Sequence, residues 1–423
     1  MLLAILKLLK DNPAYRLILA GGLFSSIGSG LTQVAVFGEL AKGEASPLTF
    51  ASTFVLSILP GLFTSAVGAR MCYKYSWVKI LFIADLLGAI SITIPILGIT
   101  LHSTLLLQMS EFTSSALAGI IIPSTFLFSK IYFQENELAA VAVINNYIFS
   151  ANVLIGYGLG ALCFGYFGAY TYFSLDILTF IASAVIVLLA KKRDVRLSQV
   201  HSVSDQSTPG EKKPWWRRLS IKQKRAWLLL PILTLFGGPA VALLPSIGLG
   251  FGKEIQLSGL VFNSVAIFIF SKTLGQMLGP IFVTESIFER LSKNNIALFC
   301  FSSGFCILYL FTCQTQHVIS ALIAVVIAHV FSNIIFIMAS YSLTRHFSSE
   351  EIGLASARQY QFQILLLTAL SMLSGTLAEY FSVKNVLFSM EIIALTLLAI
   401  LLLLDGNSRK KLGHVSSRLI NQR

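Results

Sequence analysis

Charged side chains are scarce in this sequence: Lys, Arg, Asp and Glu make up 12% of its 423 residues. Soluble globular proteins carry about 25% of such residues. Apolar residues make up 55%, and the mean hydropathy is +0.79. A chain with this composition has too few polar groups for a water-exposed surface. We therefore exclude a soluble globular protein and predict a protein that crosses a membrane many times.

Signatures of catalysis, cofactor binding and metal binding are also missing. The sequence has no HExxH, GxSxG or P-loop pattern, and no hydrophilic segment long enough for an ATP-hydrolysing domain. Its five cysteines are an odd number and include no CxxC pair, so we expect neither a disulfide framework nor a metal site. We predict a protein that is not an enzyme and has no cofactor.

One long hydrophilic stretch, residues 191–226, divides the apolar sequence. It holds 11 Lys or Arg residues against three acids, and no hydrophobic core forms from its Ser, Gln, Thr, Pro and Gly. Because positive charge is retained on the cytoplasmic side of a membrane, we predict a cytoplasmic linker. Residues 198–210 are expected to be mobile, and 214–227, with tryptophans among cations, could form an interfacial helix on anionic lipid.

Twelve apolar segments are long enough to span a membrane, which takes about 20 residues each. They lie at 17–40, 47–69, 78–101, 104–129, 138–165, 168–190, 227–252, 256–283, 295–313, 317–343, 353–380 and 383–404. This predicts an N-terminal six-helix bundle (1–190), the linker (191–226), a C-terminal six-helix bundle (227–404) and a basic cytoplasmic tail (405–423).

The distribution of basic residues supports this layout. The side assigned to the cytoplasm holds 26 Lys and Arg residues, the opposite side holds three, and only Lys272 and Arg358 lie inside predicted spans. This asymmetry predicts that both termini are cytoplasmic in a multi-pass protein of the inner membrane. The net charge of +12 then favours contact with anionic lipid headgroups, and we expect no nucleic-acid partner.

The two halves show internal similarity. The segment ENELAAVAVINNYIF, ending at Phe149, aligns with SSEEIGLASARQYQF, ending at Phe362, and FSLD, ending at Asp176, aligns with FSME, ending at Glu391. The offsets of 213 and 215 residues are nearly constant, as expected for a duplicated six-helix unit.

Several local motifs carry a resemblance to a known family. They are Asn12, Tyr15 and Arg16 followed by Gly21, Gly22 and Gly28; IIPSTF at Pro123; ENELAAV before Asn145 and Asn146; Gly156, Gly160 and Gly165; and Pro245, Gly275 and Gly279. Together they resemble the major facilitator superfamily, and within it the drug-efflux and siderophore-export branch that includes macrolide efflux pumps and the enterobactin exporter. The resemblance implies an all-α fold of twelve transmembrane helices in two bundles, acting as a monomer.

One loop departs from the family pattern. The loop after the second helix usually carries an acid that helps to latch the two halves, but here it reads GARMCYKYSWVK from Gly68, with Cys72 at the acidic position. The departure puts the latch, and not the fold, in doubt. Asp85, Arg70 and Lys74 are candidates to provide a substitute for this latch.

Ionisable residues inside predicted spans are candidates for substrate binding and proton coupling. Glu111 lies about two turns into the fourth span, and Lys272 lies near the middle of the eighth. An unpaired ammonium there would cost about 3 kcal/mol or more. Lys272 could meet an anionic substrate or a carboxylate such as Glu111, or it could form a structural ion pair in the second bundle.

The remaining candidates have a structural reading beside the functional one. For substrate or proton contacts they are Asn145, Asn146, Glu39, His329 and Arg358. The alternatives are helix packing for the asparagines and His329, the headgroup boundary for Glu39, and snorkelling to the interface for Arg358. The repeat-related Asp176 and Glu391 are expected to play structural roles.

These features predict a secondary active transporter that exports a drug-like compound or siderophore in exchange for protons by alternating access. The cations inside the spans suit an anionic solute. One alternative is an importer of an anionic solute, or a lipid flippase, with the same fold. Another, from a different class, is a membrane sensor or scaffold that transports nothing. The expected partners are a small-molecule substrate, protons and membrane lipids.

Overall fold

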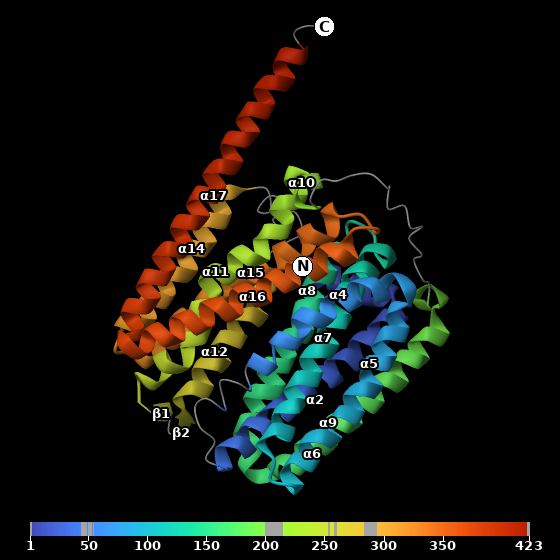
Figure 1. Cartoon of the computed structure of the whole chain (residues 1–423), viewed down its shortest axis with the longest axis vertical. Coiled ribbons are helices and arrows are strands. Elements are labelled where there is room, and N and C mark those ends of the chain that lie inside the picture. The colour runs from blue at the N-terminus through green and yellow to red at the C-terminus, as the bar shows by residue number, and fades with distance from the viewer. Residues whose placement is uncertain are drawn as a thin grey trace.

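The described residues fold into helices, apart from one short β-hairpin (Figure 1). The computed structural model describes residues 2–43, 49, 53, 55–198, 215–252, 254–257, 260–282 and 294–420. The expected mobility of 198–210 lies almost wholly outside these residues. Ser198 itself ends a short 3₁₀ helix.

The first half consists of α1 (Leu2–Asp11), α2 (Pro13–Lys42), α4 (Leu59–Lys74), α5 (Trp77–Ser91), α6 (Thr93–Thr100), α7 (Thr104–Tyr132), α8 (Leu138–Ala151), the π-helix η1 (Asn152–Leu159), α9 (Gly160–Arg193) and the 3₁₀ helix η2 (Val195–Ser198). The second half consists of α10 (Trp215–Arg218), α11 (Ile221–Leu249), β1 (Glu254–Leu257), β2 (Leu260–Asn263), α12 (Ser264–Leu278), the 3₁₀ helix η3 (Gly279–Phe282), α14 (Asn295–Gln314), α15 (Val318–His346), α16 (Ile352–Tyr380) and α17 (Val383–Ile420).

Ten helical segments in the described ranges are long and apolar enough to cross a membrane. Two predicted spans correspond to shorter helices. The span at 47–69 is represented by α4, which has 16 residues and continues to Lys74, and the span at 256–283 is represented by α12, which has 15. Residues 44–48, 50–52, 54 and 283–293, in or next to these two spans, lie outside the described ranges, so the count of twelve remains a prediction.

The eighth predicted span is wrong in its first part. Residues that were expected to begin a helix at 256 form the antiparallel pair β1 and β2, with Leu257 opposite Leu260. Ser258 and Gly259, a turn-forming pair, lie between the strands in the sequence. A short apolar run of this kind does not distinguish strand from helix by its periodicity.

A backbone kink divides α9 into two helical parts, close to the boundary between two predicted spans. Gly168 has φ 68° and ψ 169°, a conformation that glycine adopts freely and that other residues avoid. The kink therefore redirects the chain between the spans predicted at 138–165 and 168–190 without a loop.

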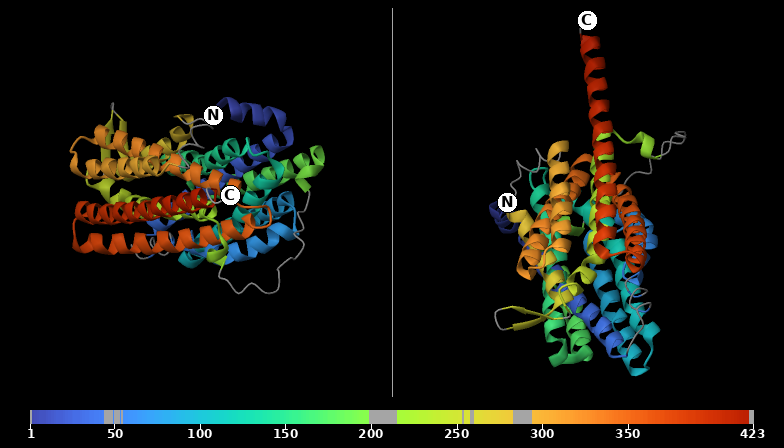
Figure 2. Two further views of the ribbon diagram at one scale, coloured as in Figure 1. Left: turned by 90° about the horizontal axis from the view of Figure 1, so that it is seen from above. Right: turned by 90° about the vertical axis from the view of Figure 1, so that its left-hand side faces the viewer.

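The helices form two bundles that lie side by side (Figures 1 and 2). In the first, α2 packs against α9 and α4 against α7; in the second, α11 packs against α16, and α12 and α14 pack against α15. The bundles meet where α16 contacts α4 and α7, and where α15 contacts α8. We call the end that carries residues 194–198 and 215–220 the linker end. The hairpin lies at the opposite end (Figure 1).

The second part of the linker docks on the protein and forms no long interfacial helix. The one-turn α10 is followed at once by α11, because Ser220 caps α11 in a capping box with Gln223. Trp215 and Trp216 lie against Trp227, with ring centroids 6.0 and 5.2 Å from it. The cluster of aromatic rings fixes the linker at the start of the second bundle.

The last helix is longer than predicted. α17 continues past the expected end of the span at 404 to Ile420, so that residues 405–420 of the predicted tail are helical. Figure 1 shows this part of α17 standing clear of the bundles on the side of α10. The C-terminus and the linker therefore share one end of the molecule.

Candidate functional site

A cavity inside the first bundle has the properties of a binding site. It has a volume of about 550 Å³ and lies among α2, α5, α7, α8 and α9, while Phe336, Ser340 and Thr344 of α15 line it from the second bundle. Sites for small molecules commonly measure about 300 to 1,000 Å³. The cavity is large enough for a drug-sized solute.

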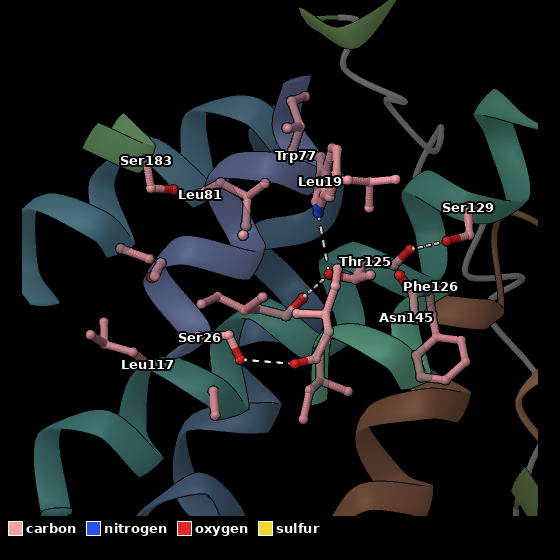
Figure 3. Close-up of a pocket in the computed structure, with 18 of the residues that line it drawn as sticks. Leu19, Ser26, Trp77, Leu81, Leu117, Thr125, Phe126, Ser129, Asn145 and Ser183 are labelled. Carbon is pink, nitrogen blue, oxygen red and sulfur yellow. Dashed lines mark hydrogen bonds between the residues drawn. The ribbon is translucent and has the colours of Figure 1, made fainter. Parts of the chain in front are cut away.

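The wall is mostly apolar, with polar groups at a few places (Figure 3). The polar residues that line it are Ser25, Ser26, Ser29, Asp85, Ser114, Thr125, Ser129, Asn145, Asn152, Ser183, Ser340 and Thr344. Several use their hydrogen bonds to hold the wall together: Ser26 donates to the Ile148 carbonyl at 3.0 Å, and Asn152 donates to the Ser26 carbonyl at 2.6 Å. An apolar wall with few polar groups suits an amphipathic solute.

Asp85 is the only Asp or Glu among the described residues of this wall, and these residues include no Lys or Arg. It projects from α5, and its Oδ2 accepts a hydrogen bond from Ser183 of α9 at 2.7 Å. Asp85 was a candidate substitute in the latch, but the structure places it in the cavity. Three serines of α2 at 25, 26 and 29, which were not among the predicted site residues, were an available signal for a polar cavity beside this helix.

Aromatic rings close the cavity toward the linker end. Trp77 stacks on Phe128 with ring centroids 3.8 Å apart, and its Nε1 donates to Thr125 Oγ1 at 3.2 Å. Tyr15, which is 2% exposed, packs beside them, with its ring centroid 6.1 Å from that of Phe128. These rings offer a flat apolar surface to a bound solute.

The predicted meeting of Glu111 and Lys272 does not occur. Glu111 is buried on α7, and its Oε2 accepts a hydrogen bond from Gln33 of α2 at 3.4 Å. Lys272 lies half-buried on α12 in the other bundle. Within the described ranges the ion pairs are Lys42 with Glu39 and Arg196 with Asp194, so neither residue has an ionic partner there.

His329 belongs to a buried polar group in the second bundle. Its Nε2 lies 2.6 Å from Tyr309 Oη and its Nδ1 lies 3.2 Å from Ser332 Oγ, so both ring nitrogens have partners. Lys272 lies on α12, which packs against α15, and a Cβ on Gly275, one turn further along α12, would lie 2.8 Å from the Cβ of His329. The contact between these helices brings Lys272 and His329 into one region, a proximity that their separation in the sequence does not indicate.

Asn145 and Asn146 face different surroundings. Asn145 lines the cavity. Asn146 forms a reciprocal amide pair with Asn333 of α15, with hydrogen bonds of 3.3 and 2.9 Å, and both residues are buried. The pair joins the two bundles beside the cavity.

Three other candidates lie away from the cavity. Glu39 forms an ion pair with Lys42 at 2.7 Å. The Arg358 guanidinium lies over the Trp215 ring, 4.7 Å from its centroid, which connects α16 to the linker. Arg70 is exposed on α4.

The repeat-related acids are both fully buried, but their partners differ. Asp176 accepts hydrogen bonds from Thr32 at 2.6 Å and from Thr179 at 3.3 Å. Glu391 accepts one from the Cys306 thiol at 2.8 Å, and its Oε1 has no partner among the described residues.

The segment with Cys72 at the acidic position is the last part of α4 rather than a loop, and it holds the two bundles together through uncharged groups. The Tyr73 hydroxyl donates to the Glu350 carbonyl at 2.7 Å and accepts from the Gly353 backbone N–H at 3.1 Å. Cys72 is buried beside Gly353, so tightly that a Cβ on this glycine would lie 2.6 Å from the sulfur. The sequence did not reveal Tyr73 as the latch residue, although it directly follows Cys72.

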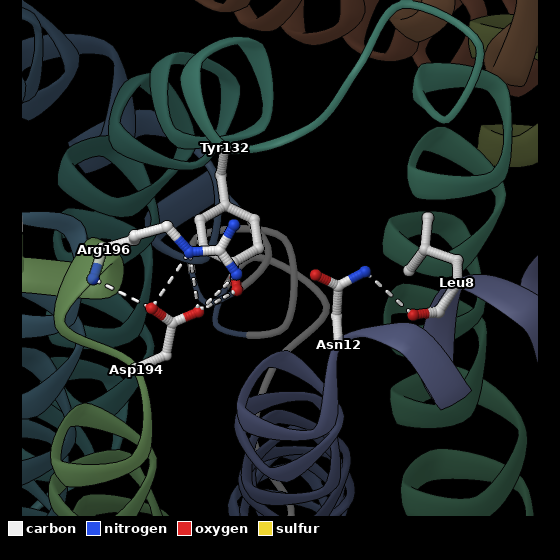
Figure 4. Close-up of polar contacts among 5 residues, drawn as sticks. All are labelled: Leu8, Asn12, Tyr132, Asp194 and Arg196. Atoms are coloured by element: carbon white, nitrogen blue, oxygen red, sulfur yellow. Dashed lines mark hydrogen bonds and ion pairs between the residues drawn. The ribbon is translucent and has the colours of Figure 1, made fainter.

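A polar cluster holds the start of the linker (Figure 4). Arg196 and Asp194 form an ion pair at 2.8 Å, and Tyr132 donates to Asp194 Oδ2 at 2.7 Å. The hydrogen bonds from Arg196 lower the pKa of Asp194 to about 2. This cluster ties the end of α9 to the end of α7.

Solved structures share this architecture. A bacterial homologue of the iron transporter ferroportin in an outward-facing state aligns with a TM-score of 0.68 and 11% identity, over 93% of this chain and 99% of that chain. The fucose:proton symporter FucP of E. coli aligns with 0.65 and 12%, over 93% and 98%. The human organic anion transporter MFSD10 aligns with 0.67 and 13%, over 90% and 98%.

FucP is a major facilitator superfamily transporter. The chain described here has the major facilitator fold. This fold and the ten apolar helices make it a multi-pass membrane protein. At these identities the similarity extends to the fold and not to the substrate.

Sequence comparisons add little to this. No family model matches the chain. A segment of 51 residues is 43% identical to an uncharacterized 29.9 kDa protein of Pseudescherichia vulneris, and it covers 12% of this chain and 19% of that protein. The matched segment is thus under one fifth of that relative's length.

Proposed function

We propose that the protein is a secondary transporter that moves a solute by alternating access of its two bundles, and that the cavity of the first bundle is the solute site. The cavity carries this proposal. It combines a drug-sized volume, an apolar wall and a single carboxylate from Asp85. Export in exchange for protons is the direction that the resemblance to the efflux branch favours.

The charge of the wall favours one class of solute. Its described residues include the Asp85 carboxylate and no Lys or Arg, and Lys272, which suggested an anionic solute, lies in the other bundle on α12. A carboxylate in an apolar wall attracts a cation. We therefore propose that the solute is an amphipathic, drug-like cation rather than an anion.

The test is transport by the purified full-length protein in liposomes, with ethidium as the amphipathic cation. We expect ethidium flux that a pH gradient accelerates, and we expect Asp85→Asn to reduce it at least roughly tenfold. Glu39→Gln is the matched control, because this acid lies outside the cavity in an ion pair with Lys42. A wild-type protein without ethidium flux would contradict the cation site, and flux that ignores the gradient would contradict proton coupling.

A further inference from the structure

The carboxyl of Glu391 is the least satisfied buried acid that the structure describes. It is fully buried on α17, with one thiol donor from Cys306 and an unpartnered Oε1. A thiol is a weak hydrogen-bond donor, and a buried carboxylate without a cation or several donors carries a large desolvation cost. The surroundings of Glu391 therefore favour the neutral, protonated acid.

The titratable groups around Glu391 come from one neighbouring helix. Cys306, Tyr309 and Cys313 follow one another at helical spacings on α14, and the Cys306 thiol donates to the carboxyl itself. Lys384 lies two turns before Glu391 on α17 and forms no ion pair with it. α11 and α16 also pack against α17, and their described residues form no ion pair with the carboxyl. Glu391 thus has no counter-ion among the described residues that would fix its charge.

The polar groups continue from Glu391 through the second bundle. Tyr309, one helical turn from Cys306 on α14, has its Oη 2.6 Å from the Nε2 of His329, and α12, which carries Lys272, packs against α15 at His329. Lys272 is half-buried, whereas Tyr309 and His329 are buried. A line of ionisable groups therefore leads from the buried acid to a residue in partial contact with the surroundings.

α15 connects this line with the cavity. His329, Asn333, Phe336, Ser340 and Thr344 follow one another at helical spacings of four, three, four and four residues, which places them on one face of α15. His329 contacts Tyr309, Asn333 pairs with Asn146, and the last three line the cavity. A shift of α15 would therefore change both the contact between His329 and Tyr309 and the wall of the cavity.

We propose that Glu391 is the proton-binding carboxyl that couples transport, held in the second bundle apart from the solute site in the first. In the proposed step a proton adds to the free Oε1 of the carboxylate to give the neutral acid, and it returns to water when the transporter changes state. The inference rests on the proposed proton-coupled transport. It assigns the proton to a different bundle from the solute.

Infrared difference spectra of the protein in lipid test the proton site without any solute. On a change from acidic to alkaline pH, we expect the wild type to lose a carboxylic acid C=O band that Glu391→Gln lacks throughout. Cys306→Ser should keep the band and shift its frequency, because the partner of the carboxyl changes from a thiol to a hydroxyl. Difference spectra that are identical in Glu391→Gln and the wild type would overturn the proposal.

Transport with ethidium separates this inference from the proposed function. Glu391→Gln should keep ethidium exchange, which needs no net proton movement, while it loses gradient-driven flux at least roughly tenfold. A folded Glu391→Gln protein with full gradient-driven flux would overturn the proton site and leave the proposed function intact. A wild type without gradient-driven flux would overturn the proposed coupling itself, whatever the spectra show.

Discussion

Asp176 in α9 and Glu391 in α17 lie 215 residues apart at matching positions of the two repeats, but their surroundings have diverged. Two threonine hydroxyls bind the first acid, one of them from α2, whereas the second has a single thiol partner. In the first half the acid cross-links helices around a cavity. In the second half the acid lies in a packed core, and one of its carboxyl oxygens has no hydrogen-bond partner among the described residues. Equivalent positions in a duplicated fold can thus serve packing in one copy and chemistry in the other.

The first membrane-length helices of the two halves, α2 and α11, differ in a second way. In α2, Gly30 allows the backbone to meet η1: a Cβ there would lie 2.5 Å from the Asn152 carbonyl oxygen and 2.7 Å from the Gly156 Cα. In α11, a Cβ on Gly237 would have nothing within 4 Å. The first bundle therefore depends on a close backbone contact next to its cavity, and no such contact is present at Gly237.

The largest expected effect comes from filling that contact. Gly30→Ala should lower the stability of the folded protein by about 3 kcal/mol, because the methyl group meets backbone atoms that cannot move independently. Gly237→Ala is the control and should be neutral or slightly stabilising. The melting temperatures of both variants in detergent, monitored by size-exclusion chromatography, test this prediction. Equal melting temperatures would show that the first bundle tolerates a wider helix contact than the distances imply.

The next prediction compares the loss of stability when each of the two acids is replaced by its amide. Asp176→Asn should cost about 1 to 2 kcal/mol, because an amide cannot accept from both threonines. Glu391→Gln keeps an oxygen that can accept from the Cys306 thiol and replaces only the oxygen that has no partner among the described residues, so it should cost less than about 1 kcal/mol. Melting temperatures of the two variants in the same detergent test this order. A larger loss for Glu391→Gln would mean that its carboxyl has a structural partner.

Loss of the uncharged latch should shift the equilibrium between joined and separated bundles at the linker end by about 1 kcal/mol. Tyr73→Phe removes the hydroxyl that bridges Glu350 and Gly353, so the bundles should separate more often at the linker end. In a protein whose other cysteines are serine, maleimide labelling of the buried Cys72 should become about fivefold faster. Tyr75→Phe is the control, since its ring contacts Lys74 and Lys79, which both belong to the first half. An unchanged labelling rate would rule out Tyr73 as a latch.

The smallest effect concerns the start of the linker. Asp194→Asn should cost less than about 1 kcal/mol, because the ion pair with Arg196 is partly exposed. The pKa of Asp194 is lowered to about 2 from its usual 3.8, so its contribution is complete above pH 3.8 and is lost as the pH falls through about 2. The difference in melting temperature between wild type and variant should shrink over that range. A difference that is independent of pH would argue against the ion pair.

Much of the fold could be predicted because long apolar runs and loop charges specify spans locally. α7, α14, α15 and α16 begin and end within three residues of the predicted spans. The hairpin at 254–263 was missed, since its short apolar run fits either strand or helix. The shortened α4 could not be foreseen from hydropathy alone.

The site was harder to predict, because it depends on which helix faces meet. Glu111 and Lys272 were chosen for their depth in a span, and depth says nothing about partners in another helix. Asp85 was a candidate for the latch, whereas its position on α5 turns it toward Ser183. His329 and Asn333 were separated from their partners by many residues, so only the packed structure brings them together.

The amide pair of Asn146 and Asn333 has a consequence for the electrical behaviour of the protein. Primary amides carry no net charge and do not ionise near neutral pH. Charges that move across the membrane respond to its voltage, by about 2.3 kcal/mol per charge for each 100 mV. A neutral amide pair feels neither the voltage nor the pH. The contact that joins the two bundles beside the cavity should therefore be equally strong in energised and de-energised membranes.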